Sequence, residues 1–139
     1  MPLTVRVLTP QRALPDQEAD FVLLPGADGQ LGILPGHAPL AALLTDGAVR
    51  ISRRNQADSR FVVRGGMAQV ENNTVTILAE DLCEADCVSE ADLVKRLQAL
   101  DAATYADGVA LAQAKAEAHW LVTQLRCAGK TVPDLKQVG

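Results

Sequence analysis

His37 is a natural starting point for chemistry, because histidine titrates near neutral pH and can act as a general base. The chain holds one other histidine, His119. A general base needs a positioned partner, and neither a Ser-His-Asp order nor a nucleophile elbow surrounds His37. We therefore interpret His37 as a structural or interface residue. A small enzyme that uses His37 with nearby acids is the less favoured alternative.

Three cysteines, Cys83, Cys87 and Cys127, could in principle bind a metal or form a disulfide. Their odd number favours free thiols. Cys83 and Cys87 have the spacing C-x-x-x-C, but no second pair follows them, and the chain has only two histidines. We predict that the cysteines pack as small apolar side chains and that there is no metal site.

Seven acidic residues, and no Lys or Arg, lie between residues 71 and 92. They are Glu71, Glu80, Asp81, Glu84, Asp86, Glu90 and Asp92. Paired carboxylates could bind a metal or perform glycosidase chemistry, but these acids lack the EF-hand order with its central glycine. We predict a solvated edge that leads into the N-terminus of a helix.

Residues 29–40, GQLGILPGHAPL, hold three glycines and two prolines. Glycine permits positive φ and proline fixes φ, so this pattern predicts a rigid loop of specific shape. No Gly-Lys-Ser/Thr follows and no helix starts there, which argues against a phosphate-binding loop. The segment is therefore expected to present a surface to a partner, and a tight structural turn is the alternative.

The composition narrows the function classes further. Of the 139 residues, 48% are hydrophobic and 3% are aromatic, and the net charge is -4. Nucleic-acid binding needs clustered basic residues and stacking rings, so we predict none. The apolar runs are far shorter than the roughly 20 residues that span a bilayer, and the start lacks a signal-peptide pattern. These features predict a cytoplasmic protein without direct membrane insertion.

Residues 3–79 alternate apolar and polar side chains with a period of two, as half-buried strands do. Val5 and Val7, for example, flank Arg6. Polar turn residues, such as those at 71–73, separate the runs. Several short strands at this spacing predict a β-sandwich or a flattened barrel, and the absence of long helical runs between them argues against a βαβ sheet.

The period changes to that of a helix at Ser89, which with Asp92 resembles a capping box. Leu93, Leu97 and Leu100 then form one apolar stripe. An alanine-rich stripe between residues 111 and 125 predicts a second helix, which Gly129 would end. The predicted organisation is a β-sandwich domain over residues 1–88 and an antiparallel two-helix hairpin over residues 89–139.

The sign of the charge changes after Gly108. The basic residues there are Lys115, Arg126, Lys130 and Lys136, and the acids are Glu117 and Asp134. A mildly basic helix could approach an acidic partner surface, or it could be a solvated helix face with cations near its C-terminal end. The residues alone leave both interpretations open.

Several stretches resemble the epsilon subunit of the F-type ATP synthase, which is called delta in mitochondria. They are GILPGHAPL at residues 32–40, DGAVRI at 46–51, Gly65 and Gly66 before AQV at 68–70, and NTVTILA at 73–79. Residues 111–126 resemble the second helix of that family. The resemblance covers nearly the whole chain.

The resemblance implies a mainly β fold with an added α part, a ten-stranded sandwich followed by a helical hairpin. It also implies a non-catalytic rotor subunit without a cofactor, bound to the gamma subunit and to the membrane c-ring. Such a subunit couples proton or sodium-ion flow to ATP synthesis and lies peripherally at the cytoplasmic face of the membrane. A free-standing β-sandwich interaction scaffold is the alternative.

The resemblance also assigns residues to surfaces. The c-ring interface would comprise Gly29, Gln30, Leu31, Gly32, Pro35, Gly36 and His37. The family often has an acid where Gln30 stands, so one possible ion pair is missing here.

In the family the hairpin can oppose ATP hydrolysis by contacting acidic segments of the alpha and beta catalytic subunits. Lys115 and Arg126 are the corresponding candidates here. Some bacterial members bind ATP through an Ile/Leu-Asp-x-x-Arg-Ala motif, which aligns with residues 88–93. Asp92 replaces the arginine of that motif, so we expect no nucleotide binding by this route.

Overall fold

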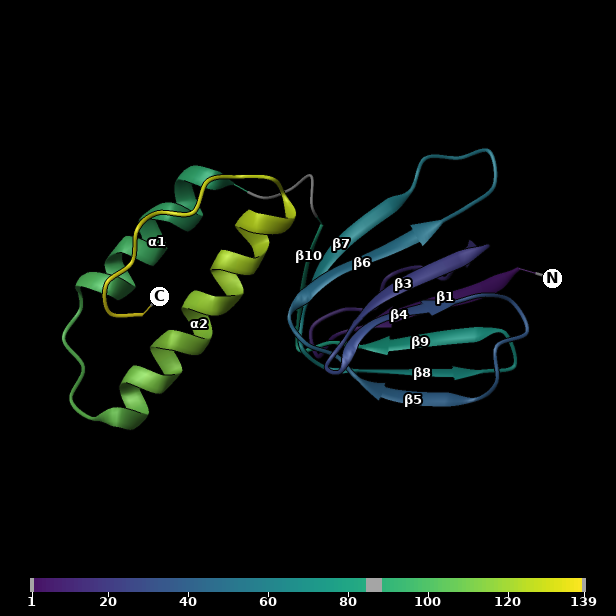
Figure 1. Cartoon of the computed structure of the whole chain (residues 1–139), viewed down its shortest axis with the longest axis horizontal. Coiled ribbons are helices and arrows are strands. Elements are labelled where there is room, and N and C mark those ends of the chain that lie inside the picture. Colours follow the sequence, from purple (N-terminus) through teal and green to yellow (C-terminus); the bar gives the residue numbers. More distant parts are fainter. Residues whose placement is uncertain (1, 85–88, 139) are drawn as a thin grey trace. The chain divides into compact units, whose positions relative to one another are not determined.

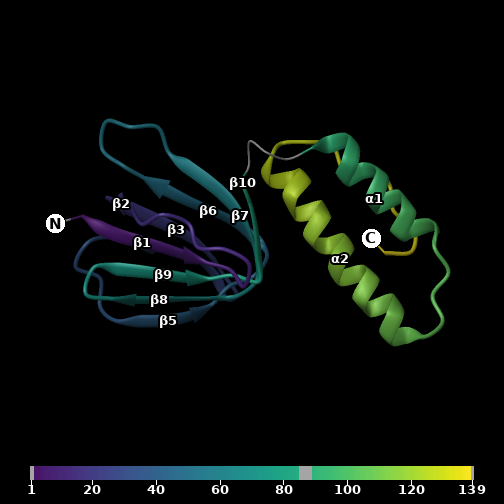
Figure 2. The same cartoon turned by 180° about the vertical axis from the view of Figure 1, so that it is seen from behind.

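The computed structural model describes residues 2–84 and 89–138. Within them the chain forms ten strands and two helices. Figures 1 and 2 show that the strands come first along the chain and the helices follow. It divides into two compact units, Met1–Glu84 and Ala85–Gly139. The predicted β-sandwich followed by two helices is confirmed. The predicted domain boundary after residue 88 adjoins residues 85–88, which lie outside the described part of the chain.

The first unit is a sandwich of two five-stranded sheets. The first sheet has the order β2-β1-β9-β8-β5, in which β1 and β9 are parallel and the other neighbours are antiparallel. Its strands are β1 (Leu3–Leu8), β2 (Gln17–Ala19), β5 (Leu40–Leu43), β8 (Met67–Glu71) and β9 (Thr74–Leu78).

The second sheet has the order β10-β7-β6-β3-β4 and is antiparallel throughout. Its strands are β3 (Phe21–Gly26), β4 (Gly29–Ile33), β6 (Gly47–Ser52), β7 (Ser59–Arg64) and β10 (Asp81–Glu84). β4 and β5 are therefore edge strands of the two sheets, and residues 34–39 connect them along the chain.

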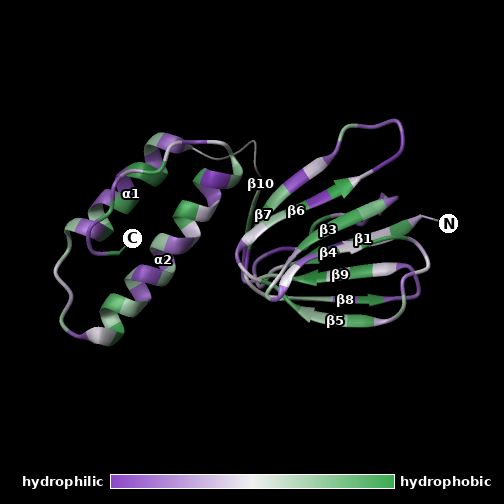
Figure 3. Ribbon diagram, viewed as in Figure 1, coloured by the Kyte–Doolittle hydropathy of each residue, from purple (hydrophilic) through white to green (hydrophobic). Residues whose placement is uncertain are grey.

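The sandwich core consists of the inward side chains of both sheets. Val5 and Val75 of the first sheet and Val49 and Ile51 of the second are fully buried, as the period-two pattern predicts. Figure 3 shows hydrophobic colour along β3 and β9 and hydrophilic colour in the loop between β6 and β7. Burial of each such Val or Ile side chain contributes about 1.5–3 kcal/mol to the free energy of folding. Aliphatic packing therefore stabilises the sandwich with almost no aromatic residues.

The second unit contains α1 (Glu90–Ala102) and α2 (Gly108–Cys127). Ser89 is the N-cap residue of α1, but its side chain makes no capping hydrogen bond, so the predicted capping box is wrong. For α2, the side chain of Asp107 accepts a hydrogen bond from the Ala110 amide. Gly129 has a φ of 72° directly after the C-cap of α2, as predicted.

The two helices pack through the predicted leucine and alanine stripes. Leu97, Leu121 and Leu125 are fully buried at their contact, and Ala118 is almost so. Because α1 has only 13 residues, a length that is marginal for an isolated helix in water, this shared cluster stabilises it against α2.

Gly66 gives a test of the sandwich. It has a φ of +106°, and a Cβ added there would overlap the Leu78 carbonyl oxygen and lie 2.8 Å from the Cα atom of Ala79. We expect Gly66→Ala to lower the free energy of unfolding by more than about 3 kcal/mol, measured by urea denaturation with circular dichroism. The control is Gly65→Ala, at φ +57° with no atom nearer than 3.8 Å, which should cost about 1–2 kcal/mol. Equal losses of unfolding free energy in the two variants would contradict the close contact of Gly66 with Leu78 and Ala79.

Candidate functional site

The glycine-proline segment forms a tight turn that is fixed to a second turn of the sandwich. The Gly36 amide donates to Oδ1 of Asn73 at 2.7 Å, and the His37 amide donates to the Leu34 carbonyl at 3.1 Å. Asn73 belongs to the turn between β8 and β9, and its own carbonyl accepts from the Thr4 amide. The Asn73 side chain therefore joins two turns that lie 37 residues apart in sequence.

The imidazole of His37 bonds to the neighbouring backbone. Its Nδ1 lies 2.7 Å from the Ala38 carbonyl oxygen, and an Nδ1–H can donate there. This geometry suits the predicted structural or interface role, since it orients the ring without an acid or a nucleophile. Among residues 2–84 and 89–138, no group of three or more His, Cys, Asp or Glu side chains is arranged to hold a metal.

The structure separates the predicted c-ring residues into two groups. Gly29 and Gln30 lie at the turn between β3 and β4, where they pair with Gly26 and Pro25. Pro35, Gly36 and His37 follow the other end of β4. A five-residue strand separates its end residues by about 13 Å. The two groups therefore lie along one edge of the sandwich, at opposite ends of its edge strand.

The remaining two residues of that set have packing roles. A Cβ added at Gly32 would lie 2.9 Å from the ring of Phe21, so Gly32 makes room for this aromatic side chain. Leu31 is partly buried against the sandwich core. It also lines a groove of about 390 Å³ between the β3–β4 turn and β5.

A feature that the sequence interpretation missed is a row of exposed apolar side chains across the first sheet. Leu8 pairs with Leu78, Leu78 with Met67, and Met67 with Leu43, so the register places one residue from each of four strands side by side. Their exposed fractions are 36%, 44%, 39% and 69%. We call these four residues the apolar row. Such a contiguous patch is typical of a protein-docking surface.

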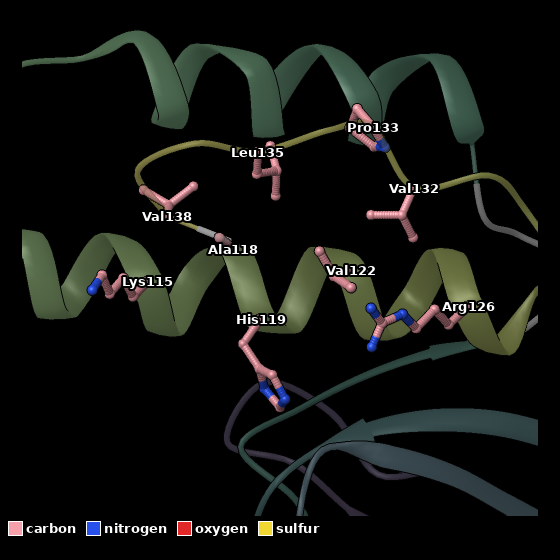
Figure 4. Close-up of a pocket in the computed structure, with 9 residues that line it drawn as sticks. All are labelled: Lys115, Ala118, His119, Val122, Arg126, Val132, Pro133, Leu135 and Val138. Carbon is pink, nitrogen blue, oxygen red and sulfur yellow. The ribbon is translucent and has the colours of Figure 1, made fainter.

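Lys115 and Arg126 both lie exposed on α2. Eleven residues separate them, which is about three helical turns, so they project from the same side of α2 about 16 Å apart. Together with His119 they line a pocket of about 440 Å³ between α2 and residues 132–138 (Figure 4). The described residues that line this pocket include these two cations and no acid, so it is a cationic region of the helical unit.

Most of the acids between residues 71 and 92 and two of the three cysteines belong to the described part of the chain. The six described acids between residues 71 and 92 are all exposed, which confirms the predicted solvated edge for them. Burial raises the pKa of the Cys127 thiol, and the Cys83 thiol donates to the Glu84 carbonyl oxygen at 3.4 Å. Asp86 and Cys87 lie outside the described residues. The raised pKa of Cys127 is the opposite of the lowered pKa that characterises a nucleophilic cysteine.

The fold and these surfaces define a class of protein in which a rigid β-sandwich with an exposed apolar row precedes a helical pair with a cationic side. The family model described as "ATP synthase, Delta/Epsilon chain, beta-sandwich domain" matches residues 2–85. The chain therefore belongs to the ATP synthase delta/epsilon chain family, as the sequence resemblance predicted.

Curated relatives agree with this assignment. The chain is 38% identical over 126 residues to the ATP synthase epsilon chain of Herminiimonas arsenicoxydans, covering 88% of this chain and 90% of the relative. It is 43% identical over 104 residues to the chloroplastic ATP synthase epsilon chain of Porphyra purpurea, covering 75% of each chain. The alternative of a free-standing scaffold is not favoured, because these relatives are ATP synthase subunits.

A solved structure shares the fold at low sequence identity. A chain in the Tetrahymena thermophila mitochondrial ATP synthase central stalk and c-ring structure has a TM-score of 0.67 and is 16% identical. The match covers 91% of the present chain and 96% of that chain. The sandwich with its helical pair is thus an arrangement that occurs in solved ATP synthase structures.

Asn73 gives a test of the fixed turn. Asn73→Ala should lower the free energy of unfolding by about 2 kcal/mol, because it removes both the hydrogen bond to Gly36 and a residue suited to its positive φ of 57°. The matched control is Asn55→Ala, whose φ of 62° is similar and which should cost about 1 kcal/mol from backbone strain alone. Urea denaturation measures both variants. Equal losses would mean that the Asn73 side chain contributes nothing.

Proposed function

We propose that the chain is a non-catalytic central-stalk subunit of a rotary F-type ATP synthase. It would couple proton or sodium-ion movement through the c-ring to ATP synthesis, without a cofactor of its own. Membership of the delta/epsilon family supports this role, and so does the fold shared with a central-stalk and c-ring structure. The bond of His37 to a backbone carbonyl gives no support to catalysis by this residue.

The apolar row is the observation that carries the proposal. We infer that Leu8, Leu78, Met67 and Leu43 form the surface that docks on the gamma subunit. Complete burial of one leucine or methionine contributes about 1.5–3 kcal/mol to association. The four residues belong to four hydrogen-bonded strands, so a load applied at this face is distributed through the whole sheet. A rotor subunit needs such stiffness to transmit torque.

The c-ring interface is proposed along the edge strand β4. Gln30 lies at one end of this strand, and His37 follows its other end. A small loop could not contact both, but a broad ring of repeated polar loops could lie along the whole edge. Gln30 is exposed and can donate and accept hydrogen bonds there.

The helical unit is proposed to oppose ATP hydrolysis. Lys115 and Arg126 project from one side of α2, which suits contact with acidic segments of the alpha and beta catalytic subunits. Nucleotide binding is not expected at the start of α1. Asp92 is exposed in the first turn there, and its carboxylate would repel phosphate groups. Val88, at the start of the aligned motif, lies outside the described residues.

The domain assignment and location remain part of this proposal. Residues 1–88 would form the rotor-docking domain and residues 89–139 the regulatory domain. In the described part of the chain, no helix is both long and apolar enough to cross a membrane. We propose a peripheral position at the cytoplasmic face of the membrane, reached through the c-ring and the gamma subunit.

Leu43 tests the docking surface. Leu43→Ser should weaken binding to the gamma subunit about tenfold or more, because it removes an apolar contact while leaving a side chain that is 69% exposed in the free chain. Calorimetry with purified gamma subunit measures the affinity. The control is Leu34→Ser, a 58% exposed leucine outside the apolar row, which should bind normally. Equal affinities for both variants would remove the apolar row as the docking surface.

The basic side of α2 tests inhibition. Removing residues 89–139 should raise ATP hydrolysis by the assembled complex. The double change Lys115→Gln and Arg126→Gln should raise it as well, because it leaves the helices in place and removes their charge. The matched control, Lys95→Gln, changes an exposed lysine of α1 and should have no effect. Unchanged hydrolysis in the truncated chain would argue against inhibition by the helical unit.

A further inference from the structure

Residues 130–138 run back along the helical pair. Figures 1 and 2 show this segment turning after α2 and passing beside α1. It forms neither helix nor strand. Its start is fixed at the end of α2, where the Lys130 amide donates to the Leu125 carbonyl at 2.8 Å. We call residues 130–138 the strap.

The side chain of Asp101 binds the C-terminal part of the strap, and we call the hydrogen bonds of this contact the clasp. Its carboxylate accepts hydrogen bonds from three successive backbone amides, those of Lys136 at 2.9 Å, Gln137 at 2.5 Å and Val138 at 3.1 Å. The carboxamide of Gln137 in turn donates to the backbone carbonyls of Asp101 and Ala103 at 3.1 and 2.9 Å. The strap therefore satisfies both a charged side chain and carbonyl groups at the end of α1.

This arrangement explains an otherwise unfavourable acid. Asp101 is in the last turn of α1, where the helix dipole disfavours negative charge, and no basic residue shares that turn. The strap supplies the missing partners as backbone N–H groups. Their hydrogen bonds, led by the amides of Lys136 and Gln137, hold the pKa of Asp101 below its ordinary value.

The sign of this shift fixes when the clasp contributes stability. A carboxyl group with a lowered folded-state pKa stabilises the fold above its unfolded-state pKa, which is about 3.9 for aspartate. That contribution is lost as the pH falls through the lowered value. Asp101 is therefore ionised at physiological pH, and the clasp is permanently charged there.

Apolar contacts hold the strap along its length. Val138 is 4% exposed within the cluster that contains Leu97, Leu121 and Leu125. Val132 and Leu135 pack against the same cluster. Figure 4 shows these strap side chains opposite Ala118 and Val122 of α2. The strap thus contacts the apolar cluster shared by both helices, while its clasp is on α1.

We propose that the strap locks α1 and α2 into the hairpin and that the hairpin opens only after the strap is released from Asp101. The match to the family model of the delta/epsilon sandwich domain ends at residue 85, so it gives no role to the strap. The inference concerns the isolated chain and goes beyond the proposed function. Its consequence is that any partner that opens the helical pair must first displace the strap.

Amide hydrogen exchange of the whole chain tests the lock. In Asp101→Ala, the amides of residues 136–138 should exchange about tenfold faster or more, because they lose a charged acceptor. The α1 amides should also exchange faster. Alanine has a higher helix propensity than aspartate, so this second effect cannot be attributed to a weaker helix. The control is Asp134→Ala, which removes the same charge from an exposed position in the strap and should leave exchange unchanged.

A chain that lacks residues 131–139 provides the second variant. It should show faster exchange across the facing parts of both helices, with the sandwich amides unchanged. Unchanged exchange at residues 136–138 in Asp101→Ala would overturn the clasp. Helices that keep their full protection after truncation would overturn the lock, because the strap would then be a passive segment.

The assembled complex gives a separate measurement that rests on the proposed function. If opening of the helical pair inhibits hydrolysis, Asp101→Ala should strengthen that inhibition, and Asp134→Ala should not. Faster exchange in the isolated chain without a change in hydrolysis would preserve the strap and contradict inhibition through opening of the helical pair. These two failures are therefore distinguishable.

Discussion

Cross-strand register in the sheet β2-β1-β9-β8-β5 is the constraint on which the proposed docking surface depends. A shift of one residue in any strand would exchange its buried and exposed faces. The fully buried Val5, Val75 and Ile77 fix the register from inside. The same register aligns Leu8, Leu78, Met67 and Leu43 on the outside. Core packing and the exposed apolar row are therefore two consequences of one pairing pattern.

The two units differ in how they are held together, and this difference suits two tasks. The sandwich has a continuous core between two five-stranded sheets, which resists local opening. The helical pair has a smaller cluster, supplemented by hydrogen bonds to Asp101. Elements of low local stability are the ones that move in regulated proteins. A stiff head with a clasped pair of helices can transmit load through one part and change conformation in the other.

Local patterns predicted most of the elements, because the period of two or 3.6 residues reflects how strands and helices bury one face. The Gly129 helix end followed in the same way, since a positive φ suits glycine. The apolar row could not be predicted from such local patterns. Leu8 and Leu78 stand at outward positions of their strands, but only register brings them beside Met67 and Leu43. The split of the predicted c-ring residues likewise depends on where β4 begins and ends.

The strap could not be predicted from the sequence for a related reason. Residues 130–138 have no regular period, and the partner of their amides, Asp101, lies 35 to 37 residues earlier. The spacing of Val132, Leu135 and Val138 was the available signal, but three apolar residues beside a proline are too few to define a packed face. The failed Ser89 capping box shows the converse, because a local motif can be present without forming its hydrogen bond.

Site-specific photo-crosslinking from position 67 tests the central claim most directly. A benzophenone amino acid in place of Met67 lies in the middle of the apolar row and would be incorporated into the assembled ATP synthase. Mass spectrometry would then identify the crosslinked chain. We expect crosslinks to the gamma subunit. Crosslinks to the c-ring alone, or none in a complex of full activity, would contradict it.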